Sequence, residues 1–182
     1  MKRIAAFLAC GLLVLTIIGH ADAVDFPDFS LPIYPGATNQ KTHLDKPAKG
    51  VKAATYRIAT VFPARDLIEF YNKEMKKRGF KKYHDPLDSL TQFEWNTFNS
   101  RTGNWEPTRL PPARYTAKWS NEKEDQFVWV LIDFKPNQKE LQSGTASVSI
   151  HVARYSEYLK ELDAIKKSEH NKADVPDQKS VR

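Results

Sequence analysis

The clearest structural signal in the chain is the segment from residue 63 to residue 80, which reads PARDLIEFYNKEMKKRGF. Its apolar side chains recur at helical spacing, at Leu67, Ile68, Phe70, Tyr71 and Met75. Pro63 suits the first position of a helix, where a missing N–H costs nothing, and Gly79 suits the left-handed residue that ends one. We therefore predict a helix through Arg78, with Leu67, Phe70 and Tyr71 packed on a sheet.

Strand patterns flank this helix on both sides. Val51–Phe62 precedes it, and the later candidates are Phe80–His84, Thr91–Phe98, Arg114–Ser120, Phe127–Phe134 and Gly144–Ala153. Polar turns at 121–125 and 135–138 favour antiparallel pairing of consecutive strands. The run from Phe127 to Ile132 lacks alternation, so we predict a central strand that is buried on both faces.

A second helix is expected from about Ser156. The order of elements predicts an α+β fold, in which an antiparallel sheet of about five to six strands carries one helix after the first strand and a C-terminal helix packed on it. With 182 residues, of which 41% are hydrophobic, the chain suits one globular domain. We assign residues 24–50 to an extended lead-in, 51–167 to a single α+β domain and 168–182 to a disordered, polar tail.

The first 23 residues have the pattern of a secretory signal peptide. Lys2 and Arg3 precede an apolar run, and the sequence ADA at 21–23 provides the small residues that signal peptidase needs. The apolar run is shorter than a spanning helix requires. Cys10 raises the alternative of a lipoprotein, but acylation there would leave a strongly apolar N-terminus on the mature chain. We expect cleavage after Ala23 and a periplasmic or secreted bacterial protein.

The lead-in contains one ordered feature, the Pro-Gly turn in the sequence YPGA at 34–37, which we expect to dock on the domain and then reverse. This turn, the strand that ends near Thr60, the LIEFY sequence at 67–71 and Gly79-Phe80 together resemble a loose group of uncharacterised bacterial secreted proteins and lipoproteins. The resemblance covers about 50 residues. It implies a small α+β domain of the cell envelope and supplies no catalytic residue.

Several kinds of chemistry lack their usual signatures. The mature chain contains no cysteine, its histidines are far apart, and it has neither a nucleophile elbow nor a Gly-rich phosphate loop. His84-Asp85 could orient an imidazole, although a surface turn before Pro86 explains the pair as well. We therefore expect no catalytic residues, no metal and no cofactor, and a role in binding rather than catalysis.

The segment from Asn99 to Pro112 is long for a hairpin connection. It presents Arg101, Trp105 and Arg109, and an exposed Trp beside Arg can stack on a ligand or anchor a partner. The alternative is that Trp105 folds back to cover the sheet. These three residues form the candidate binding site.

The formal net charge of +6 points to an anionic partner. A second candidate site is therefore the basic cluster at the end of the predicted helix, formed by Lys76, Lys77, Arg78, Lys81 and Lys82. Export makes an anionic envelope component or an envelope protein the expected partner, and nucleic acid is not expected. The leading hypothesis is a non-enzymatic binding or accessory domain of the cell envelope. The alternative is a hydrolase-like envelope enzyme.

Overall fold

The computed structural model describes residues 30–46, 50–85 and 90–173. The predicted signal peptide and Cys10 lie outside the described residues, as do residues 174–182 of the predicted tail. The elements are β1 (Thr38–Lys46), β2 (Val51–Val61), α1 (Arg65–Lys77), β3 (Lys81–Lys82), β4 (Trp95–Asn99), β5 (Asn104–Pro107), β6 (Ala113–Asn121), β7 (Gln126–Pro136), β8 (Ser143–Arg154) and α2 (Tyr155–Ala173).

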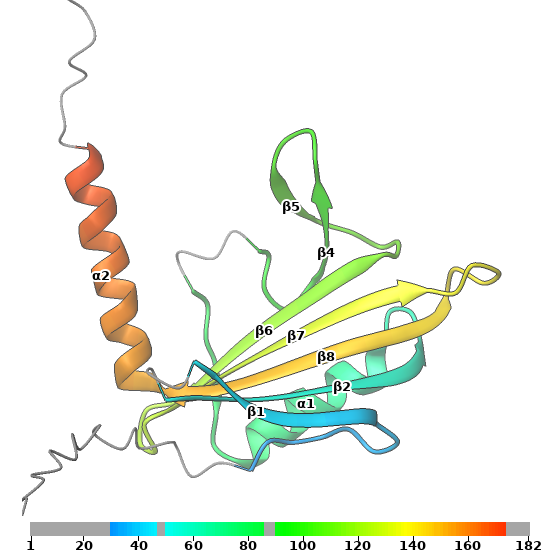
Figure 1. Cartoon of the computed structure of the whole chain (residues 1–182), viewed down its shortest axis with the longest axis horizontal. Coiled ribbons are helices and arrows are strands. Elements are labelled where there is room, and N and C mark those ends of the chain that lie inside the picture. Colours follow the sequence, from blue (N-terminus) through cyan, green and yellow to red (C-terminus); the bar gives the residue numbers. More distant parts are fainter. Residues whose placement is uncertain (1–29, 47–49, 86–89, 174–182) are drawn as a thin grey trace, which may run out of the picture.

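The strands form one antiparallel sheet in the order β1-β2-β8-β7-β6-β4-β5, and the short β3 also pairs with β6. In Figure 1 the long strands run side by side, with α1 behind them. The β4–β5 hairpin and α2 extend from the sheet on the other side. Among the described residues, α1 covers one face of the sheet, and no helix covers the other face along most of its length.

The predicted α+β fold is wrong in its number of strands and in the position of its first helix. The described residues form eight strands, strand makes up 48% and helix 20%, and α1 follows the second strand. The two strands that the sequence did not reveal are β1, in the predicted lead-in, and β5, in the predicted loop. All nine residues of the edge strand β1 are exposed, and β5 has only four residues, so neither carries an alternating apolar pattern.

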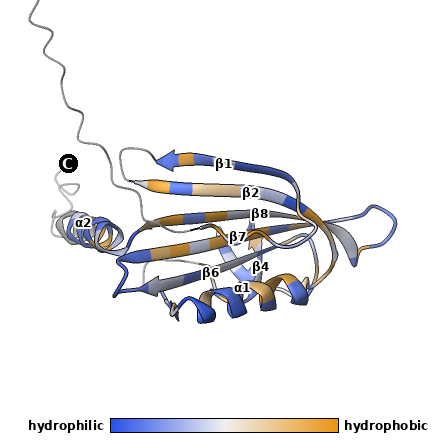
Figure 2. Cartoon of the chain, turned by 90° about the horizontal axis from the view of Figure 1, so that it is seen from below, coloured by the Kyte–Doolittle hydropathy of each residue, from blue (hydrophilic) through white to orange (hydrophobic). Residues whose placement is uncertain are grey.

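The hydrophobic core lies between α1 and the covered face. Leu67, Tyr71 and Met75 of α1 are buried against apolar side chains of the four central strands. Those strand residues are Tyr56 of β2, Val148 and Ile150 of β8, Val130 and Ile132 of β7, and Tyr115 and Ala117 of β6. α1 lies along one side of the sheet in Figure 2. Phe70 packs against this core but is only half-buried, and its ring lies edge-on to that of Tyr34, with centroids 5.2 Å apart.

The C-terminal end of α1 and the YPGA turn match the sequence signals, whereas the prediction that Pro63 opens the helix is wrong, because α1 begins at Arg65 after a left-handed Ala64. Gly79 has a positive φ of 78°, and the N–H of Phe80 donates to the Met75 carbonyl (3.0 Å), which satisfies the end of the helix. The N–H of Ala37 donates to the Tyr34 carbonyl (3.1 Å) across the predicted turn. Leu31 and Ile33 pack against the core, so this part of the lead-in docks as expected.

The second helix contacts the sheet through its first turns. The ring of Tyr158 stacks on Phe127 of β7, with centroids 3.7 Å apart, and Leu162 is buried. Beyond that point α2 extends away from the sheet, as Figure 1 shows, and it continues to Ala173, past the predicted domain boundary at 167. Packing of α2 is thus confined to one end of the sheet.

Leu67 is the residue with which to test this core. Leu67→Ala should lower the free energy of unfolding by about 2–5 kcal/mol, because it removes a fully buried side chain. Leu110→Ala is the matched control, since Leu110 is 72% exposed and its truncation should change stability by no more than about 0.5 kcal/mol. Urea unfolding measures both, and equal effects of the two substitutions would contradict the placement of α1.

Candidate functional site

The open face of the sheet, the one opposite α1, carries mainly polar side chains. The strand registers place Arg57, Ser147, Asp133 and Arg114 in one row across β2, β8, β7 and β6. Side chains alternate between the faces of a strand, so this row is opposite in phase to the core residues Tyr56, Val148, Ile132 and Tyr115. The row forms the centre of the candidate site.

One strong ion pair lies within this row. The Nε of Arg114 is 2.7 Å from Oδ1 of Asp133, and the Nη2 of Arg114 is 3.1 Å from Oδ2 of the same carboxylate. A two-point contact of this kind fixes the orientation of both side chains and neutralises the carboxylate. Both side chains are still partly exposed, so a ligand can reach them.

The β4–β5 hairpin carries Trp105 beside this ion pair. Trp105 is paired with Phe98 across the hairpin, and their ring centroids are 5.5 Å apart. The guanidinium of Arg114 lies over the Trp105 ring at 5.0 Å, which is cation–π distance. Trp105 is half-buried and Phe98 is 52% exposed. Trp105 is therefore neither fully exposed, as a binding loop would predict, nor part of the core.

The structure does not place the predicted arginines against Trp105. Arg101 lies in the turn of the hairpin, where its backbone N–H donates to Oδ1 of Asn99 (3.0 Å). Arg109 is exposed in the connection after β5. Among the described residues, the cation over the Trp105 ring is Arg114, which the sequence analysis did not select.

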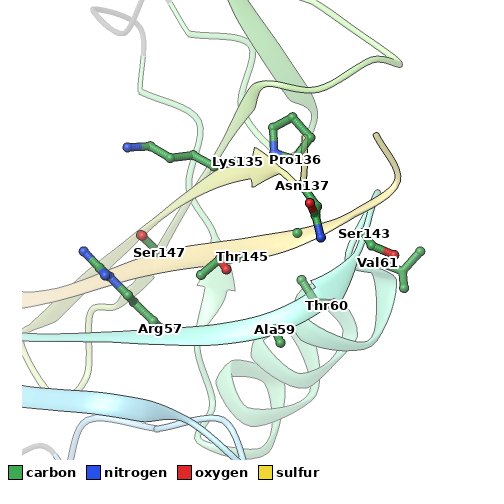
Figure 3. A pocket seen from close by; sticks show the side chains of 11 residues that line it. Arg57, Ala59, Thr60, Val61, Lys135, Pro136, Asn137, Ser143, Thr145 and Ser147 are labelled. Atoms are coloured by element: carbon green, nitrogen blue, oxygen red, sulfur yellow. The ribbon is translucent and has the colours of Figure 1, made fainter. Parts of the chain in front are cut away.

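Beside the row, the end of the sheet holds a shallow hollow of about 810 Å³ between β2, β8 and β7. Figure 3 shows Arg57 and Lys135 on either side of Ser147, with Thr145 next along the strand and Asn137 at the other end of the hollow. The lining contains two cations, four hydroxyl side chains and one amide, and no carboxylate; its residues are Arg57, Ala59, Thr60, Val61, Lys135, Pro136, Asn137, Ser143, Gly144, Thr145 and Ser147. Within the described part of the chain, neither Arg57 nor Lys135 has an acidic partner.

The opposite end of the open face is closed by contacts with α2 and β1. Lys118 pairs with Asp85 (2.8 Å), and the hydroxyl of Tyr158 donates to the same carboxylate. The imidazole of His151 stacks on Trp129 with centroids 4.8 Å apart, and its Nδ1 is 3.2 Å from Oδ2 of Asp45. The charged groups at this end of the open face therefore form contacts with one another inside the protein.

The predicted basic cluster gathers around the end of α1. Lys76 and Lys77 are exposed in its last turn, and Lys81 is exposed on β3. Arg78 pairs with Glu74 (3.2 Å) and donates to the Ser30 carbonyl, and the ammonium of Lys82 lies over the Phe93 ring at 4.5 Å. Arg78 and Lys82 thus have partners in the protein, and Lys76, Lys77 and Lys81 are exposed.

Comparison of the chain with known proteins gives no match. No protein family, no curated protein and no solved structure matches the chain. Within residues 30–46, 50–85 and 90–173, no three His, Cys, Asp or Glu side chains gather as a metal site would require. No helix in the same residues is long and apolar enough to cross a membrane.

Part of the open face could have been predicted from the sequence. In β6, every second residue from Arg114 to Ser120 is polar, while the intervening positions hold Tyr115 and other core residues; β7 shows the same alternation only from Ile132 to Lys135. This alternation marks the side chains that avoid the core, but it does not give the register that joins them. The row across four strands therefore required the structure.

His151 gives a pH-dependent test of this face. Burial lowers the pKa of its imidazole, and Asp45 offsets part of this effect, while His43 and Lys46 lower the pKa further. Because the folded state disfavours the protonated form, the unfolded state binds more protons, and stability should fall as the pH decreases from about 8 to about 5.5.

We expect this pH-dependent loss of stability to be reduced in His151→Asn, which has no group that titrates in this range. Urea unfolding of both proteins at several pH values measures the difference. Identical slopes of stability against pH in the two proteins would show that His151 titrates as freely in the folded chain as in the unfolded one.

Proposed function

We propose that this protein is a non-enzymatic binding domain of the bacterial cell envelope and that its open sheet face binds an anionic envelope component. The observation that carries the proposal is the hollow at the end of the sheet, where Arg57 and Lys135 flank Ser147 and no carboxylate lines the wall. An anionic group in this hollow would meet two cations and several hydroxyl donors.

The strand geometry supports joint action of the two cations. Arg57 is on β2 and Lys135 on β7, and these strands lie on either side of β8. Neighbouring strands are about 4.8 Å apart, and Lys135 is paired with Thr145 whereas Arg57 is paired with Ser147, so the two Cα atoms are separated by about 12 Å, which long side chains can bridge from both sides. One phosphate or carboxylate above Ser147 would therefore be within reach of both.

The nearest carboxylate does not oppose such binding. Asp133 lies beside Ser147 in the register, but its two oxygens are held by Arg114. The local field over the hollow therefore stays positive. By contrast, the cations at the other end of the open face are neutralised, because Lys118 is paired with Asp85.

The cellular location in this proposal depends on the signal pattern at the N-terminus. We expect the exported protein to begin at Val24, because signal peptidase cuts after a small residue such as Ala23. Intact mass of the protein recovered from the envelope fraction measures this. A mass that includes residues 1–23, or a lipid on Cys10, would contradict the expected processing.

Binding by the hollow is tested with short-chain polyphosphate, an anion that contains neither sugar nor lipid. The variant R57A/K135A should bind it about tenfold more weakly than the natural protein, because two charge-assisted contacts are lost. Both side chains are exposed, so the melting temperature should stay unchanged. Calorimetric titration at low ionic strength gives the affinities.

The matched control is K76A/K77A, which removes the same charge from the last turn of α1, on the other side of the sheet. It should bind polyphosphate as the natural protein does. If instead K76A/K77A lost binding and R57A/K135A kept it, the basic cluster of α1 would be the anion site. Equal losses would show that net charge alone governs the interaction.

A further inference from the structure

A second hollow adjoins the first and has a different character. It lies between the β4–β5 hairpin and the sheet, and it shares Lys135 and Ser147 with the first hollow. Its distinctive lining residues are Trp105, Phe98 and Asn96, together with the Arg114–Asp133 pair. The open face thus joins an aromatic surface to a cationic end.

The aromatic part is suited to a flat, partly apolar surface of a ligand. Phe98 is more than half exposed, Trp105 is half-buried, and both are held on neighbouring strands of a hairpin. Such rings bury large areas with little loss of conformational freedom, and the indole N–H can reach a polar partner. A lone phosphate would gain nothing from this surface.

The polar groups beside the rings include both donors and acceptors. Asn96 is fully buried, and its Nδ2 donates to the carbonyls of Thr91 (2.7 Å) and Glu94 (3.0 Å). Its Oδ1 has no hydrogen-bond partner in the structure. This atom is covered by the protein, so the acceptor that a ligand can reach is Asp133, while Arg114 and Ser147 offer donors.

These features together select one class of ligand. A sugar ring has an apolar C–H face, which packs on aromatic rings, and hydroxyls that both donate and accept hydrogen bonds. The row from Arg57 to Arg114 crosses four strands, or about 14 Å, which is longer than a single sugar ring. The cationic hollow at the far end of the row would bind an acidic group on a second ring of the same ligand.

We infer that the ligand is an acidic oligosaccharide that lies across the open face. One ring packs against Trp105 and Phe98, and its hydroxyls are held by the Arg114–Asp133 pair. The acidic group of a neighbouring ring is held by Arg57 and Lys135. This inference rests on the proposed function, because it names the chemistry of the anionic component.

The test uses oligogalacturonate, a chain of uronic acids, and the same oligomer after methyl esterification, which removes its charge. The natural protein should bind the acidic form, and the ester should bind about tenfold more weakly. Trp105→Ala should lower the affinity for oligogalacturonate about tenfold but leave that for polyphosphate unchanged. Trp105→Phe, which keeps an aromatic ring, should retain part of the sugar affinity.

Two controls separate binding from folding. Leu110→Ala changes an exposed residue shortly after the same hairpin and should leave both affinities unchanged. In NMR spectra of the natural protein, the indole N–H signal that is missing from Trp105→Ala identifies Trp105, and it should shift on addition of oligogalacturonate. A melting temperature near that of the natural protein shows that each variant is folded.

The outcomes separate the two proposals. Binding of polyphosphate without binding of oligogalacturonate, or equal sugar affinity in Trp105→Ala and the natural protein, would overturn the oligosaccharide inference and leave the anion-binding face intact. Failure of both probes would overturn the proposed function itself. Loss of both affinities in R57A/K135A, with loss of the sugar affinity alone in Trp105→Ala, supports both.

Discussion

The packing of α1 on one face of the sheet is the constraint on which the remaining structure depends. One helix buries Leu67, Tyr71 and Met75 against four strands and so supplies the core for that face. No comparable element covers the middle of the other face in the described residues, and α2 reaches only one end of it through Tyr158 and Leu162. An antiparallel sheet tolerates this arrangement only if its open face is compatible with water. The polar row and the two hollows are a consequence.

The same constraint explains which parts of the fold could be predicted. Helix α1 and the long strands β2, β6, β7 and β8 each contribute to the covered face, so their apolar residues could be recognised in the sequence, by periodicity in most of them and by a continuous apolar run in β7. The central position of β7 was predicted correctly, but only part of its open face is buried: Phe127 is covered by α2, whereas Leu131 is partly exposed. Strands β1 and β5 lie at the sheet edges and add little to the core, so the total of five to six strands was too low.

The candidate site was less predictable than the fold, because it is assembled by register. Trp105 could be selected from its place in a long connection, but its cation, Arg114, comes from the next strand and not from the connection itself. Arg57 and Lys135 are far apart in sequence and line one hollow only because β8 lies between β2 and β7. Periodicity assigns a side chain to a face, whereas the position along the neighbouring strand depends on turns and bulges such as the irregular β1–β2 pairing.

The charges of the open face divide into two groups with different physical roles. Lys118 and Asp85 are largely buried, so each needs the other, and removal of one partner would leave an uncompensated charge and weaken the fold. Arg114 and Asp133 are intermediate in exposure, so substitution there would alter both stability and any contact with a ligand. Arg57 and Lys135 are exposed, and exposed cations need no partner for stability. Affinity in the cationic hollow can therefore change without a change in the fold, which makes it the part of the surface where binding and folding are separable.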